Sequence, residues 1–185
     1  MKLINPKTET FDHLDAESKE IMRKTIDFFE RKGKDKLKED YHAKVWYADF
    51  LEFVKQEKIF YKLLTPAKYG KEGCRWDTAR NCDFNEILGF YGLPYWYTWQ
   101  VTILGLGPIW MGNNEAVKKR TAELLEQGEI FAFGLSEKEH GADLYSSEMT
   151  LTQLSEGRYV ADGGKYYIGN ANKAGLVSVF AKDSD

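Results

Sequence analysis

The chain has 185 residues and a formal net charge of −3, and 43% of its residues are hydrophobic and 30% charged. This composition is typical of a globular chain rather than a disordered one, and no apolar run approaches the ~20 residues that a membrane-spanning helix needs. Acidic and basic residues are interleaved, so no stretch is suited to follow a nucleic-acid backbone, and the N-terminus lacks the apolar core of a secretion signal. We expect a cytoplasmic protein that neither binds nucleic acid nor spans a membrane.

The first part of the chain shows the apolar spacing of amphipathic helices. Asp15 is placed to cap a helix that ends at Gly33, where a residue without a side chain favours helix termination. A second helix is predicted after Asp35 and is closed by Pro66. With a short joint between them, the two helices would form an antiparallel pair.

Helix-start and helix-stop residues also organise the middle of the chain. Asp77 and Asp83 are both candidate caps, and Asp83 has a glutamate three residues later, as in a capping box. Pro94 breaks or restarts the next helix, and the nearly uncharged segment 94–105 predicts a buried core helix. One more helix, which Gly128 ends, completes the helical part.

After Gly128 the apolar period changes from that of a helix to that of a strand. The apolar run 130–135 predicts a buried strand that ends in a polar turn. Alternating residues around a turn at 156–157 predict a hairpin, and 165–168 and 176–181 are further expected strands. The fold class is therefore α+β.

We divide the chain into a helical N-terminal domain, 1–129, and a partial β domain, 130–185. Cys74 and Cys82 have neither CxxC spacing nor a histidine cluster nearby, so no metal site is expected. A disulfide between them is possible in principle, but a cytoplasmic setting argues against it.

Three segments carry a resemblance to a known family. Phe133–Asp143 resembles the flavin-binding signature of acyl-CoA dehydrogenases, which follows an apolar strand. Asp162–Asn170 resembles the family's second motif and comes at the expected distance, and Gly107–Asn113 resembles the turn that precedes the family's next helix. Two motifs in order are much more specific than either one alone.

The resemblance implies a helical N-terminal domain, a middle β-barrel and a C-terminal four-helix bundle. The chain would then hold an all-α domain followed by the start of an antiparallel β-barrel domain, with the C-terminal helical bundle absent. We interpret it as a fragment of a longer product, and a natural short form stays open.

The same resemblance implies an FAD site. Ser136 keeps the hydroxyl of the family's threonine, whereas Tyr167 stands where the family has the tryptophan that covers the flavin. Gly169 replaces a threonine whose hydroxyl meets flavin N5, and Ala142 replaces a serine that contacts cofactor and substrate. Gly141 would let the backbone approach closely. The implied cofactor-binding residues are Phe133, Leu135, Ser136, Gly141, Ala142, Tyr167, Ile168 and Gly169.

The aromatic block at residues 90–99, which precedes Gly107, has two interpretations. By resemblance its helix lines the acyl-chain cavity, with Trp96, Trp99, Gln100 and Ile103 joining Ala142 as substrate-binding residues. Ordinary core packing of an aromatic stripe is at least as good an explanation.

The implied activity is α,β-dehydrogenation of an acyl-CoA thioester with hydride transfer to FAD. The family's catalytic base lies in the C-terminal bundle, so no catalytic residue is named here, and Glu137 is structural by resemblance. Implied partners are electron-transfer flavoprotein or a similar acceptor and, at full length, further copies in a homodimer or homotetramer. Alternatives are a flavin oxidase or monooxygenase on this scaffold, and a non-catalytic binding or assembly subunit.

Overall fold

The structure is a computed structural model that describes residues 5–184. Helices come first and short strands last, so the α+β class is confirmed. The helices are α1 (Ala16–Lys32), α2 (Lys34–His42), α3 (Ala48–Gln56), α4 (Ile59–Leu64), α5 (Thr78–Tyr91), α6 (Leu93–Met111) and α7 (Glu115–Glu126). The remaining elements are β1 (Phe131–Gly134), a 3₁₀ turn (Leu144–Ser146), β2 (Thr150–Ser155), β3 (Arg158–Asp162), β4 (Leu176–Val179) and β5 (Lys182–Asp183).

The chain forms two compact units. The first, a helical unit, comprises residues up to Gln100 together with Glu115–Glu129, and the second, a mixed unit, comprises Val101–Asn114 and Ile130 onwards. Helix α6 thus contributes its first part to one unit and its second part to the other. The predicted division at residues 129 and 130 stays a prediction. Among the described residues, no helix has the length and apolar character that crossing a membrane requires.

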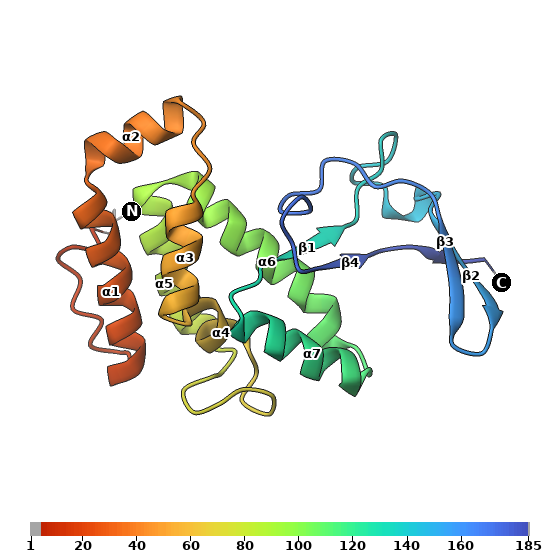
Figure 1. Cartoon of the computed structure of the whole chain (residues 1–185), viewed down its shortest axis with the longest axis horizontal. Helices are drawn as coiled ribbons and strands as arrows, with labels where there is room; N and C mark the ends of the chain where they lie inside the picture. Colours follow the sequence, from red (N-terminus) through yellow and green to blue (C-terminus); the bar gives the residue numbers. More distant parts are fainter. Residues whose placement is uncertain (1–4, 185) are drawn as a thin grey trace. The chain divides into compact units, whose positions relative to one another are not determined.

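The helical unit is built around aromatic side chains. Helix α1 packs against α5, and α4 packs against α7 (Figure 1). The ring of Trp99 has no exposed surface and lies 5.0 Å from that of Phe60 and 4.7 Å from that of Phe84. Phe29 and Phe50 are also fully buried and stack at 5.7 Å. Burial of these large rings removes apolar area from water and so stabilises this unit.

Local signals marked some helix ends correctly. The Asp15 side chain accepts a hydrogen bond from the Ser18 N–H at 3.0 Å, and Gly33 ends α1 with a φ of 78°. Asp77 caps α5 by accepting from the Ala79 N–H at 3.0 Å. Asp83 lies inside α5, so the predicted capping box there is wrong. Once the helix begins at Thr78, the amide groups near Asp83 are already bonded within it.

The single helix expected from Asp35 to Pro66 is wrong, because this stretch forms α2, α3 and α4. Lys44 and Lys58 adopt φ values of 53° and 54° at the two interruptions. A residue with this left-handed conformation ends a right-handed helix. Lysine rarely adopts it, so the sequence does not indicate a helix end here as a glycine would.

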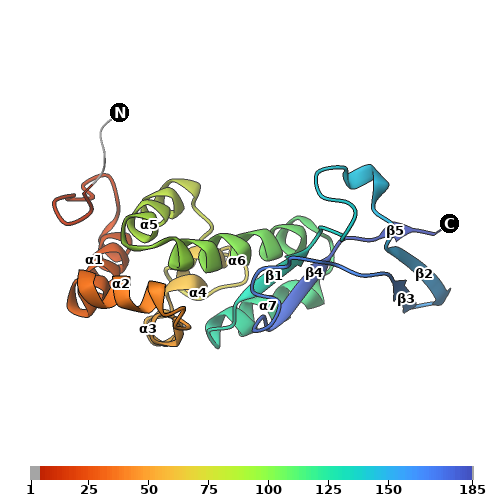
Figure 2. The ribbon, with the colours of Figure 1, turned by 90° about the horizontal axis from the view of Figure 1, so that it is seen from above.

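The mixed unit contains two small sheets. In one, β1 and β4 pair in parallel from Phe131 opposite Leu176 to Gly134 opposite Val179 (Figure 2). In the other, β2 pairs with β3 in antiparallel fashion and with β5 in parallel. The predicted hairpin at 156–157 is confirmed, with Gly157 at a φ of 70°.

Two expectations for the β part are wrong. Residues 165–168 form no strand, and an antiparallel arrangement holds only for β2 and β3. The long connection between β1 and β4 allows a parallel pair, which a short hairpin cannot produce. In the described part of the chain neither sheet closes into a barrel.

The close approach of α6 to β1 allows a test of the packing. A Cβ at Gly105 would lie 2.6 Å from the Ala132 carbonyl oxygen, whereas a Cβ at Gly107 would meet nothing within 4 Å. We expect Gly105→Ala to lower the free energy of unfolding by about 1 to 3 kcal/mol through overpacking. Gly107→Ala, the matched control, should raise it by about 0.5 to 1 kcal/mol, because alanine favours the helix. Urea denaturation of both variants measures these changes, and equal effects would contradict the packing.

Candidate functional site

The two motifs found in the sequence meet in the mixed unit. Strand β1 ends at Gly134, and the next residues lead into the polar loop 135–149. The Tyr166 N–H donates to the Ser136 carbonyl oxygen at 2.9 Å. The Lys165 ammonium donates to the Leu135 carbonyl oxygen at 3.0 Å. The backbone near residue 135 is thus bonded directly to the backbone that precedes residue 168.

A buried ion pair fastens this junction. Lys165 Nζ lies 2.7 Å from Glu137 Oε1, and the two side chains are only 8% and 7% exposed. The Glu137 carboxylate also accepts from the Glu148 N–H at 2.7 Å and the Met149 N–H at 3.0 Å. The polar loop is therefore closed at both ends by one side chain. We call this set of contacts the Glu137–Lys165 clamp.

The clamp fixes the ionisation of Glu137. Hydrogen bonds from the Glu148 N–H, the Lys165 ammonium and the Met149 N–H lower the Glu137 pKa from its ordinary 4.5 to about 2. Each of these donors stabilises the charged carboxylate relative to the acid. A carboxylate with so low a pKa and so many donors is poorly suited to abstract a proton, because a general base works best with a pKa near the operating pH.

An aromatic ring and a hydroxyl group are available beside the clamp. The Tyr167 side chain is 86% exposed, and its backbone is left-handed with a φ of 60°. Ser136 is half-buried, and its hydroxyl group makes no hydrogen bond to residues 5–184. Together they offer a stacking surface and a hydrogen-bond donor on the two joined segments, which suits a planar heteroaromatic group.

Asn170 ties the end of the second motif to strand β1. Its side chain is 6% exposed and donates through Nδ2 to the Phe131 carbonyl oxygen at 3.0 Å. The backbone carbonyl oxygen of Asn170 accepts a hydrogen bond from the Lys173 N–H at 2.8 Å, and the backbone φ of Asn170 is 61°. Asparagine tolerates this left-handed conformation better than most residues. Asn170 is the last residue of the second motif, and the sequence pattern assigns it no role.

Comparisons with known proteins find relatives in sequence and in fold. No family model matches the chain. A curated relative, the short-chain-specific acyl-CoA dehydrogenase of Megasphaera elsdenii, is 35% identical over 98 residues, which make up 52% of this chain and 26% of that protein. The solved butyryl-CoA dehydrogenase from the same organism superposes with a TM-score of 0.78 and 26% identity, covering 91% of this chain and 44% of that one.

A second solved structure, the acyl-CoA dehydrogenase of Bacillus anthracis complexed with FAD, gives a TM-score of 0.75 at 26% identity and covers 98% of this chain and 31% of that one. In sequence and in fold, the chain is similar to acyl-CoA dehydrogenases. It spans about a quarter of the curated relative and less than half of each of these solved chains.

The other residues of the predicted flavin motifs have different surroundings. Phe133 is half-buried in β1, and Leu135, Ile168 and Gly169 are half-buried at the junction. Gly141 is exposed, and a Cβ there would meet nothing within 4 Å, so no close approach within the chain requires glycine. These assignments stay predictions, as does that of the exposed Ala142.

The predicted acyl-cavity residues divide between the units. Trp96 and Gln100 are half-buried in the helical unit, and Ile103 is half-buried in the mixed unit. Trp99 is fully buried among aromatic rings. Its side chain has no surface to offer a ligand, and it lies in the core, as the packing interpretation of the sequence had it.

A cluster of side chains near the clamp has the residue types of a metal site, but its ligand atoms are already engaged in hydrogen bonds and ion pairs. Ligand atoms of Glu137, His140 and Glu148 lie within 4.8 Å of one another. Glu137 is already bound to Lys165, and His140 Nδ1 lies 2.9 Å from Asp143. Since a metal needs free lone pairs, the cluster is better explained as a network of hydrogen-bonded charges.

The low pKa of Glu137 predicts a pH-dependent loop. Its carboxylate contributes stability above pH 4.5, and this contribution is lost as the pH falls toward 2. We expect the protection of the Glu148 and Met149 amides against hydrogen exchange to fall over this range. Glu137→Gln should reduce that protection at pH 6 and remove its pH dependence.

Glu139→Gln is the matched control, because Glu139 is exposed in the same loop and has no bond to these amides. It should leave the protection of Glu148 and Met149 unchanged. Amide protection that is the same in Glu137→Gln and in the unmodified protein would show that the clamp does not hold the loop.

Proposed function

We propose that this chain carries the FAD-binding part of an oxidoreductase that dehydrogenates an acyl-CoA thioester between its α and β carbons. The observation that carries the proposal is the junction of the two motif segments by the clamp, beside an exposed Tyr167 ring and an unused Ser136 hydroxyl. The B. anthracis relative is an FAD complex, which supports the same cofactor here.

The residues of the junction fit a flavin in part. Tyr167 would cover the ring system, Ser136 would donate a hydrogen bond, and the clamp would hold both segments in place. Gly169 and Ala142 carry no side-chain donor, so any further polar contacts at these positions would come from backbone N–H groups. When bound, FAD supplies the acceptor for the two electrons removed from the substrate.

We assign no general base among these residues. Glu137 is ionised but saturated with donors, so it would serve to position the loop rather than to accept a proton. In this proposal the base comes from a segment that follows the chain, as part of a longer product. We further propose that electron-transfer flavoprotein or a similar acceptor reoxidises the enzyme, that the full-length protein forms a homodimer or homotetramer, and that it acts in the cytoplasm in fatty acid metabolism.

FAD binding tests the cofactor assignment. We expect the protein to quench FAD fluorescence saturably, and Tyr167→Ala to weaken this binding by about three- to tenfold, since an aromatic contact contributes about 0.5 to 1.5 kcal/mol beyond its area. Tyr145→Ala is the matched control, because that tyrosine is 97% exposed and lies outside both motifs. If neither this chain nor its longer product binds FAD, the non-catalytic binding or assembly role replaces the enzyme.

Turnover tests the position of the base. We expect the 185-residue chain, supplied with FAD, butyryl-CoA and an artificial electron acceptor, to show no dehydrogenation, because no carboxylate in it is assigned as the base. The longer product should be active in the same assay. Product formation by the chain alone would overturn this part of the proposal without affecting the FAD assignment.

A further inference from the structure

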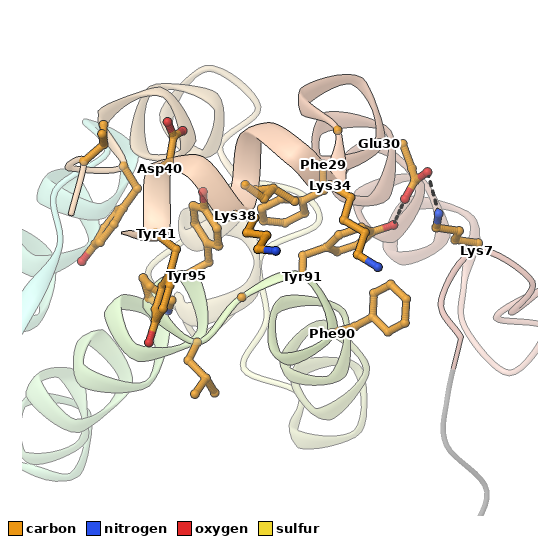
Figure 3. A pocket seen from close by; sticks show the side chains of 17 residues that line it. Lys7, Phe29, Glu30, Lys34, Lys38, Asp40, Tyr41, Phe90, Tyr91 and Tyr95 are labelled. Carbon is orange, nitrogen blue, oxygen red and sulfur yellow. Dashed lines mark hydrogen bonds and ion pairs between the residues drawn. The ribbon is translucent and has the colours of Figure 1, made fainter. Parts of the chain in front are cut away.

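The helical unit contains a cavity that the flavin motifs do not explain. Its volume is about 740 Å³, within the range of sites that hold small organic molecules. Residues from the end of α1, from α2 and from the junction of α5 and α6 line it (Figure 3). No residue beyond Tyr95 belongs to its lining, so it shares none with the predicted flavin or acyl sites.

Aromatic rings form the inner wall of this cavity. Phe29 is fully buried, and its ring stacks on that of Tyr91 at 4.6 Å and meets that of Tyr95 edge-on at 4.9 Å. These rings are held by one another and form a rigid apolar wall. Phe90 and Leu93 stand at the edge and are 48% and 66% exposed, which is unusual for large apolar side chains that border a cavity.

Helix α2 forms another wall of the cavity, and most of its side chains are exposed to solvent. Lys34, Leu37, Lys38 and Tyr41 follow one another at helical spacing and all line the cavity. Within α2 only Asp40 is buried, and Tyr41 is 63% exposed. Among residues 5–184, few side chains pack on the face of α2 that borders the cavity, so this face is largely exposed to solvent.

The charges around the cavity do not cancel. The acidic lining residues are engaged: Glu30 accepts from the Tyr91 hydroxyl at 2.7 Å and pairs with Lys7 at 2.9 Å (Figure 3). Asp40 is held by two further lysines, Lys32 and Lys36. Lys34 and Lys38 have no ion-pair or hydrogen-bond partner in the described part of the chain.

Figure 3 shows Lys34 and Lys38 among the side chains that line the cavity together with Phe90, Tyr91 and Tyr95. Two unpaired cations on one helix face, opposite a wall of aromatic rings, match a ligand that has an anionic group at one end and a flat apolar body. A neutral apolar ligand would contact the rings but would form no ion pair with either of these exposed lysines.

We propose that this cavity is a binding site for a small organic carboxylate whose apolar body contains a ring. The rings of Phe29, Tyr91 and Tyr95 receive the body, and Lys34 and Lys38 receive the carboxylate. The site is distinct from the FAD site of the proposed function and does not depend on it.

Binding of 2-naphthoate, measured by isothermal titration calorimetry, tests this site. We expect saturable binding with one molecule per chain, and weaker binding of 2-naphthamide, which has the same body without the charge. The double variant Lys34→Gln, Lys38→Gln should weaken naphthoate binding by about tenfold, because charge-assisted hydrogen bonds are lost. It should leave naphthamide binding unchanged.

Lys119→Gln is the matched control, because Lys119 is exposed on α7, outside the cavity lining. It should bind naphthoate like the unmodified protein. Leu93→Glu, which adds a negative charge to the exposed edge, should weaken naphthoate binding and spare naphthamide.

Three results would overturn the proposal: no saturable binding of naphthoate, equal binding of naphthoate and naphthamide, or an equal loss in Lys119→Gln. Circular dichroism of each variant shows whether the helices are intact, so a loss of binding is not confused with a loss of fold. FAD titration of the double variant should match that of the unmodified protein, which separates failure of this site from failure of the flavin assignment.

Discussion

The Glu137–Lys165 clamp is the interaction on which the candidate flavin site depends. It joins two segments that are 28 residues apart in sequence, and it holds the polar loop through two backbone N–H groups. Removing one partner of a buried pair leaves the other charge uncompensated, so neither residue is free to vary alone. The clamp therefore explains how a loop with charged residues, which includes Ser136, stays attached to the segment that carries Tyr167.

The clamp works together with the parallel pairing of β1 and β4. That pairing carries the chain from Leu176 to Val179 along the strand that opens into the loop, and Asn170 ties the preceding turn to the Phe131 carbonyl oxygen. Strand pairing and the Asn170 side chain thus fix one end of the junction, and one ion pair fixes the other. A site supported in this way needs little reorganisation when a ligand binds, which lowers the cost of binding.

Sequence reasoning succeeded where the signal was local. Asp15, Gly33 and Asp77 mark helix ends through their own backbone preferences. It failed where the structure depends on contacts between residues far apart in sequence, or on residues whose type does not indicate the backbone conformation that they adopt. The left-handed Lys44 and Lys58 look like ordinary helix residues, and the clamp joins side chains whose pairing no spacing rule expresses.

The aromatic residues show why composition alone cannot separate packing from binding. Trp99 and Tyr91 belong to one aromatic block, yet Trp99 is enclosed by Phe60 and Phe84 whereas Tyr91 borders an open cavity. What separates them is the opposite wall: the core supplies further rings, but α2 supplies two lysines without partners. Both lysines are exposed, so core stability does not require them there, and together with the rings they give the cavity the mixed lining on which the proposed carboxylate site rests.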